Sequence, residues 1–197
     1  MLDLRWLGRD SEGLYAVYED RGGEPATRRA SRAPLDRIRA ARVLKHVARA
    51  AQDAAAGGVL VRELRPEAVL LGEDAGGEGE EAIPTLAAWG AMRLCEPPAE
   101  GVPDCAADPF VPPERKRKAD RADARTGIYG LGALLVLLLT GSGPGEGELP
   151  EVPAAMRSFL DKTLNNATGK RYLDFDKVFF DLDRCPGAKG LEVETRR

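Results

Sequence analysis

Hydrophobic and polar residues alternate along two short segments near the start of the chain, residues 2–7 and 14–19. Alternation of this kind places successive side chains on opposite faces of a β-strand. The residues between the two segments begin with Gly8 and end with Gly13, and glycine favours a turn. The pattern therefore predicts a β-hairpin.

The periodicity then changes from two residues to between three and four. Residues 21–33 are rich in Gly, Pro, Arg and Ser, which predicts a linker with at most a short helical turn. From Pro34 onward, apolar residues recur at helical spacing until Gly57 and Gly58, and proline is tolerated in the first turn of a helix. This pattern predicts one helix of about twenty residues.

The second half of the chain contains the most apolar segment, residues 126–140, which is hydrophobic nearly all round. Such a helix is typical of a protein core, and it is shorter than the roughly twenty apolar residues that span a bilayer. A glycine-rich loop at 141–151 follows, and then two amphipathic patterns at 153–164 and 173–183 predict surface helices. The chain from Pro186 is predicted to be a polar tail.

Short apolar runs predict strands at residues 59–61, 68–71 and 83–89. Residues 96–113 hold six prolines, which excludes regular structure through most of that segment. We therefore predict a predominantly helical α+β domain.

Composition and charge narrow the classes of function. A chain of 197 residues with 43% hydrophobic residues is long enough to bury one core. Its net charge of -3 gives no overall attraction to nucleic acid or to anionic membranes. Three cysteines without a CxxC pair and a single histidine, His46, exclude the usual zinc patterns. No secretory signal is visible at the start, so we expect a cytoplasmic protein. We also expect it to hold no metal and no cofactor.

The segment 58–74 resembles the catalytic loop of the protein kinases, whose usual form is HRDLKPEN followed by apolar residues. Four of its eight positions are identical, two carry similar residues and two differ. The identical residues are Arg62, Leu64, Pro66 and Glu67, the similar ones are Glu63 and Arg65, and the departures are Val61 and Ala68.

Four further kinase landmarks follow in the family's order. They are Ala88-Trp89-Gly90 at the DFG position, Pro112-Pro113-Glu114 at the APE position, Gly127 to Gly132 at the opening of the central helix, and Arg171 at the arginine that pairs with the APE glutamate. The resemblance covers roughly residues 14–183. It implies a kinase-like C-terminal lobe at 34–185, preceded by a residual hairpin and hinge at 1–20, the linker at 21–33, and followed by a tail at 186–197.

The departures imply that the chain does not transfer phosphate. Kinase chemistry needs two magnesium ligands, which are here matched by Ala68 and Ala88, and a methyl group cannot ligate a cation that demands oxygen. The position of the catalytic base is Glu63, and we expect the phosphate-binding lysine and glycine-rich loop to be missing. We therefore expect a pseudokinase that does not bind ATP. The alternative is a nucleotide-binding or active protein that is completed by a lobe from another chain.

The residues that the resemblance implies to be retained are structural. Glu114 and Arg171 are expected to form a buried pair that ties the activation segment to the helical lobe. A basic run directly follows Glu114, at Arg115, Lys116, Arg117 and Lys118. This run has three interpretations: a docking site for an acidic protein, a contact with a polyanion, and a solvated loop balanced by Asp120 and Asp123.

A partner protein is expected from the hairpin. Two strands alone are marginally stable in water, and an unpaired edge offers a template for another chain. The apolar side chains of Leu4, Trp6 and Tyr15 are the candidate contacts. We therefore expect a homomeric or heteromeric complex, with no membrane span and no nucleic acid.

Overall fold

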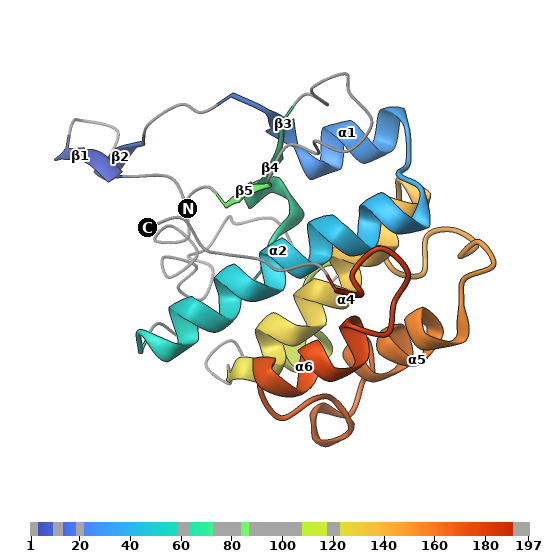
Figure 1. The fold of residues 1–197 in the computed structure, drawn as a ribbon. Helices are drawn as coiled ribbons and strands as arrows, with labels where there is room; N and C mark the ends of the chain where they lie inside the picture. Colours follow the sequence, from blue (N-terminus) through green and yellow to red (C-terminus); the bar gives the residue numbers. More distant parts are fainter. Residues whose placement is uncertain are drawn as a thin grey trace.

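The computed structural model describes residues 4–9, 14–18, 22–58, 64–72, 84–86, 108–117 and 123–190. The fold is α+β and mostly helical (Figure 1). The predicted fold class is confirmed at this level.

The N-terminal hairpin consists of β1 (Leu4–Arg9) and β2 (Leu14–Tyr18), which pair in antiparallel fashion. Arg9 lies opposite Leu14 at the turn end, and Leu4 lies opposite Tyr18 at the open end. The register shifts between Leu4 and Trp6, so β1 carries an irregularity there. The predicted hairpin is confirmed. In Figure 1 it lies at the periphery of the molecule, away from the helices.

A second, three-stranded antiparallel sheet has the order β3-β4-β5. Its strands are β3 (Glu24–Pro25), β4 (Val69–Leu71) and β5 (Thr85–Leu86). The strand predicted at 68–71 is confirmed for Val69–Leu71, since Ala68 belongs to a 3-10 turn, and the strand predicted at 83–89 is confirmed for Thr85–Leu86. The strand expected at 59–61 lies outside the described residues. The two-residue strand β3 was not predicted, because two residues show no periodicity.

The prediction of a linker at 21–33 is wrong, since α1 (Ala26–Arg32) is a seven-residue helix. Ala26 and Ala30 lie one turn apart and are fully buried, and α1 contacts α4. Gly141, just after α4, has φ +75°, and a Cβ there would lie 2.8 Å from the carbonyl oxygen of Ala30. Small residues thus let α1 approach the end of α4, and tertiary packing outweighs a composition that favours loops.

The long helix α2 (Arg37–Ala56) has the predicted twenty residues. It begins after Pro34 because Asp36 is its N-cap, and the carboxylate of Asp36 accepts hydrogen bonds from the backbone N–H groups of Ile38 and Arg39. Gly58 follows the helix with φ +77°. Leu44 and Val47 are buried on the face toward α4, whereas Ile38 is 49% exposed.

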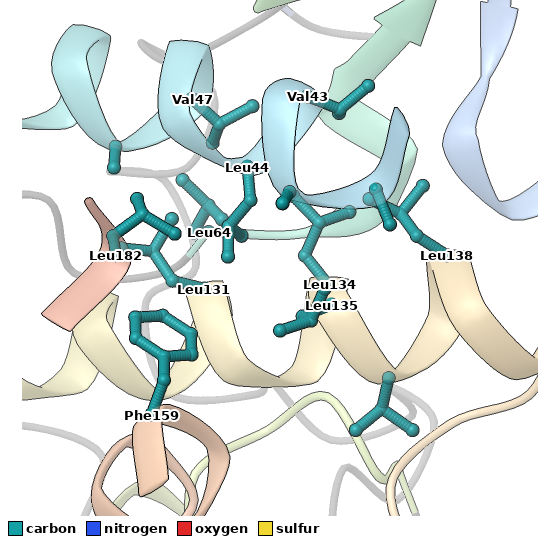
Figure 2. Packing of buried hydrophobic residues seen from close by; sticks show 14 of the residues in the cluster. Val43, Leu44, Val47, Leu64, Leu131, Leu134, Leu135, Leu138, Phe159 and Leu182 are labelled. Atoms are coloured by element: carbon teal, nitrogen blue, oxygen red, sulfur yellow. The ribbon is translucent and has the colours of Figure 1, made fainter. Parts of the chain in front are cut away.

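The central helix α4 (Ala124–Thr140) is confirmed as the core of the domain, because residues 126–139 are all buried. A capping box between Asp123 and Thr126 fixes its start. It contacts α1, α2 and α5. Figure 2 shows its leucines between the side chains of α2 and Phe159 of α5; those labelled are Leu131, Leu134, Leu135 and Leu138.

The two predicted surface helices are α5 (Ala154–Thr163) and α6 (Phe175–Leu182), which pack on each other. Residues 141–152 contain no helix, which confirms the predicted loop. Two 3-10 turns (Pro66–Ala68 and Thr168–Lys170) and the short helix α3 (Pro113–Arg117) complete the described elements. No helix in the described ranges has the length and apolar character needed to cross a membrane.

The predicted polar tail at 186–197 needs correction for its first five residues. Ala188 is fully buried, and its carbonyl oxygen accepts a hydrogen bond of 2.8 Å from Lys45 Nζ. The same ammonium group lies 2.6 Å from Asp183 Oδ1. Gly187 adopts φ +90° where its backbone crosses Ile38. A buried lysine of α2 therefore fixes this segment, while 191–197 lie outside the described residues.

Candidate functional site

The structure brings Glu114 and Arg171 together, although they are 57 residues apart. Arg171 Nη1 donates to Glu114 Oε1 at 2.7 Å, and Nη2 donates to Oε2 at 2.9 Å. The side chain of Arg171 is 0% exposed and that of Glu114 is 14% exposed. This is a bidentate pair in a buried setting, which is the strong form of the arginine–carboxylate interaction.

The remaining donors of Arg171 bind backbone carbonyl groups. Nε donates to the carbonyl oxygen of Asn165 at 2.8 Å, and Nη1 also donates to that of Arg125 at 3.1 Å. The guanidinium carbon lies 5.0 Å from the ring centroid of Tyr129. One side chain thus joins α3, the start of α4 and the segment before α6.

Tyr129 extends this cluster toward the proline-rich segment. Its hydroxyl donates to the carbonyl oxygen of Pro109 at 3.1 Å. Burial raises the pKa of Tyr129, and the nearby charge of Arg171 opposes that shift. The phenol is therefore neutral at pH 7 and acts as a hydrogen-bond donor.

The loop that resembles the kinase catalytic loop is connected to the same segment by Arg65. Its Nη2 lies 2.8 Å from Asp108 Oδ2, and its Nε lies 3.6 Å from Glu67 Oε2. Two carboxylates of this chain therefore neutralise the guanidinium of Arg65.

Leu64, at the start of this loop, packs directly on α4. A Cβ added at Gly130 would lie 2.7 Å from both the Cβ and the carbonyl oxygen of Leu64. Because real Cβ atoms essentially never approach backbone so closely, glycine is required at 130 for this contact.

The described part of the site offers little to a metal ion. Ala68 ends the 3-10 turn and presents a methyl group. No cluster of three or more His, Cys, Asp or Glu side chains suited to a metal occurs among the described residues. Arg62, Glu63 and Ala88 lie outside the described residues.

The predicted partner-binding residues fall in two places. Within the hairpin, Leu4 lies opposite Tyr18, Trp6 opposite Val17, and Tyr15 opposite Gly8. In the basic run, Arg115, Lys116 and Arg117 belong to α3 rather than to a loop, and Lys118 lies outside the described residues. Arg115 is partly buried and Lys116 is exposed.

Sequence patterns gave no sign of a second polar cluster between α5 and α6. Asp181 is buried, and its Oδ2 accepts hydrogen bonds from Lys162 Nζ and, at 2.7 Å, from the Tyr172 hydroxyl. Burial acts to raise the pKa of Asp181, but these hydrogen bonds outweigh it and hold the pKa below its usual value. Burial raises the pKa of Tyr172, and the hydrogen bond to Asp181 adds to that rise. Helical spacing places these residues near the core but does not reveal their pairing.

Two other titratable side chains are inert in this setting. Burial, with a smaller effect of Asp181, raises the pKa of Cys185 to about 11, so its thiol is protonated at pH 7. Burial, with a smaller effect of Lys45, lowers the pKa of His46, so its imidazole is neutral at pH 7. Both act as packing residues.

Neither models of known protein families nor curated protein sequences gave a match to this chain.

Proposed function

We propose that this chain is a kinase-like C-terminal lobe that transfers no phosphate and serves as a protein-binding, scaffolding or regulatory subunit of a cytoplasmic assembly. The observation that carries the proposal is the bidentate pair between Arg171 and Glu114. These are the two residues that the resemblance assigns to a pair, and no periodicity of the sequence relates them.

The order of the elements gives further support. A long helix, the loop at Leu64, a small antiparallel strand pair, a buried helix and two surface helices follow one another in the order that the resemblance implies. The close contact between Leu64 and Gly130 fixes the loop against the buried helix. The proposal accounts for a glycine at this position in the middle of an otherwise apolar helix.

The chemistry that remains favours a structural role. Ala68 offers no oxygen to magnesium, and the positive charge of Arg65 is already paired with Asp108 and Glu67. Arg171 uses its donors on Glu114 and on backbone carbonyl groups. Arg65 and Arg171 thus hold segments of the chain together.

The hairpin is the proposed docking element. Its sheet contains only β1 and β2 among the described strands, so no other described strand pairs with the outer edge of either one. The irregularity near Leu4 disrupts the ladder of β1, whereas β2 pairs without a shift from Leu14 to Val17. A strand of a partner is therefore expected along β2.

The test is the size of the native complex with a Trp6→Asp variant. The proposal expects this variant to lose the partner while circular dichroism shows an unchanged helical lobe. The matched control is Arg28→Asp, on the exposed side of α1, which is expected to keep the complex. A complex that survives Trp6→Asp, or a wild-type chain that is monomeric in its native extract, would contradict the docking role.

The melting temperature of the chain, measured with and without Mg²⁺ and ATP, distinguishes this proposal from the alternative of a nucleotide-binding or active protein. A ligand at a hundred times its Kd stabilises a protein by about 2.7 kcal/mol. The proposal expects no such increase. A magnesium-dependent increase would instead identify a nucleotide-binding protein.

A further inference from the structure

Ser31 lies in the last turn of α1 and is exposed. Two arginines, Arg28 and Arg29, stand three and two residues before it, and Arg32 follows it directly. Among the serines and threonines of the whole chain, Ser31 is the one with arginine at both of these upstream positions. Protein kinases distinguish their substrates by such charge patterns, because carboxylates of an arginine-directed kinase pair with the arginines before the serine.

The guanidinium of Arg28 is accessible to such an enzyme. Residues three apart are neighbours on the surface of a helix, so Arg28 and Ser31 share one side of α1. Arg28 is exposed and forms no hydrogen bond or ion pair within the described part of the chain. Arg32 pairs with Glu24, but its side chain is 69% exposed, and a surface pair of this kind is weak enough to be exchanged for a contact with an enzyme.

The short helix α1 can open while the core stays folded. It has seven residues, well below the length at which an isolated helix is stable in water. The side chains that it buries are those of Ala26 and Ala30. The backbone after α1 is fixed separately, since the N–H of Leu35 donates to the carbonyl oxygen of Leu138 at 2.7 Å. An element that buries so little apolar surface opens readily, which gives a kinase access to the hydroxyl of Ser31 and the backbone around it.

In the closed form, the hydroxyl of Ser31 lies between α1 and the end of α4. Its Oγ is 2.7 Å from the carbonyl oxygen of Thr27 and 3.4 Å from that of Gly141, the C-cap of α4. A Cβ added at Gly141 would lie 3.4 Å from Ser31 Cα, so the two segments are in close contact. The carboxyl ends of both helices, which carry negative partial charge, therefore meet at this hydroxyl.

We propose that Ser31 is a phosphorylation site for an arginine-directed serine kinase, and that the phosphate loosens α1 from the end of α4. Ser31 Oγ forms a bond to the γ-phosphorus of ATP, the bond from that phosphorus to the β,γ-bridging oxygen breaks, and ADP leaves with the electron pair. The hydroxyl proton passes to the catalytic base of the kinase.

The phosphate changes the contacts of Ser31 in one direction. It carries about −1.5 to −2 charge at pH 7 and offers acceptor oxygens, so the carbonyl oxygens of Thr27 and Gly141 repel it. A pair with Arg28 forms in the open form of α1 as well, because Arg28 is close in sequence, and it therefore does little to keep α1 closed. The kinase is a separate protein, so the inference is independent of the proposed kinase-like function and of the hairpin.

Phosphate incorporation into the full, folded chain tests the site. The probe is the catalytic subunit of the cyclic-AMP-dependent protein kinase, an arginine-directed enzyme, with Mg²⁺ and ATP. Peptide mass spectrometry is expected to place the phosphate on Ser31, and Ser31→Ala is expected to abolish incorporation. Arg28→Ala is expected to lower kcat/KM by about tenfold, because a charged hydrogen bond to the kinase is lost. The internal control is Ser158 of α5, which is also exposed but follows Ala155 and Met156, and which is expected to stay unmodified.

Amide hydrogen exchange of the phosphorylated and unmodified chains tests the effect. Phosphorylation is expected to speed exchange in residues 27–33 and to leave exchange in α6 unchanged. In the chain purified from its native source with phosphatases inhibited, the peptide that holds Ser31 is expected to be phosphorylated in part. No incorporation at Ser31, equal kcat/KM for the wild-type chain and Arg28→Ala, unchanged exchange in α1, or a native chain without phosphate on Ser31 would each overturn the proposal.

Discussion

The pair between Glu114 and Arg171 allows a stability prediction from its geometry. In Glu114→Gln the carboxylate becomes a neutral amide, while the guanidinium of Arg171 stays charged and buried. Removing one partner of a buried ion pair costs about 3–5 kcal/mol, because the charge that is left has lost its compensation. Arg171 keeps the carbonyl oxygens of Asn165 and Arg125, so we expect the lower half of this range.

The assay is urea unfolding followed by the helical circular-dichroism signal, with Glu67→Gln as the matched control. Glu67 lies 3.6 Å from Arg65, but its side chain is 52% exposed, and such surface pairs contribute about 0–1 kcal/mol. The melting temperature should also fall more in Glu114→Gln than in Glu67→Gln, by about 2–4 °C for each kcal/mol of stability lost. Equal losses of stability in the two variants would refute the reasoning that burial makes the first pair important.

Three further variants test the packing and the buried charges. Gly130→Ala should lower the free energy of unfolding by about 1–3 kcal/mol, since the new methyl group meets Leu64. The control Gly169→Ala should change it little, because the space around Gly169 is open. Thermal melting compares the two variants. Lys45→Met removes the donor to the carbonyl oxygen of Ala188 and should cost about 1–3 kcal/mol, with faster amide exchange in residues 184–190 as the specific sign. Asp181 has a lowered pKa when folded, so its contribution is present above the unfolded value of about 4 and is lost as pH falls through the folded value. Unfolding free energies between pH 7 and pH 2 should therefore depend less steeply on pH in Asp181→Asn, and an unchanged profile would contradict this assignment.

The periodicity of apolar residues was enough to predict the elements that bury many side chains. The long helix α2, the buried helix α4 and the amphipathic α5 and α6 all bury a stripe or their whole surface, so their patterns are visible in the sequence. The hairpin was predictable because apolar and polar residues alternate along both of its strands.

The missed elements depend on single contacts. Helix α1 is arginine-rich and buries Ala26 and Ala30 alone, which is too few positions for a hydrophobic stripe. The segment 186–190 is ordered by Lys45, a charged residue that sequence patterns place on a surface. Short-range patterns cannot reveal such contacts because the partner lies 143 residues away.

The candidate site divides in the same way. Glu114 and Arg171 were chosen from the family resemblance, and no rule of spacing would have related them. No sequence pattern marked Tyr129, Arg65 or Asp108 as site residues, because their contacts depend on backbone segments that only the fold brings together.

Transfer of radiolabelled phosphate from ATP to the chain or to general protein substrates, with Mg²⁺ present, tests the central proposal most directly. We expect no transfer above that of a Glu63→Ala variant, because Ala68 and Ala88 supply no oxygen for magnesium. Magnesium-dependent transfer that disappears in Glu63→Ala would contradict a non-catalytic role and would identify an active phosphotransferase.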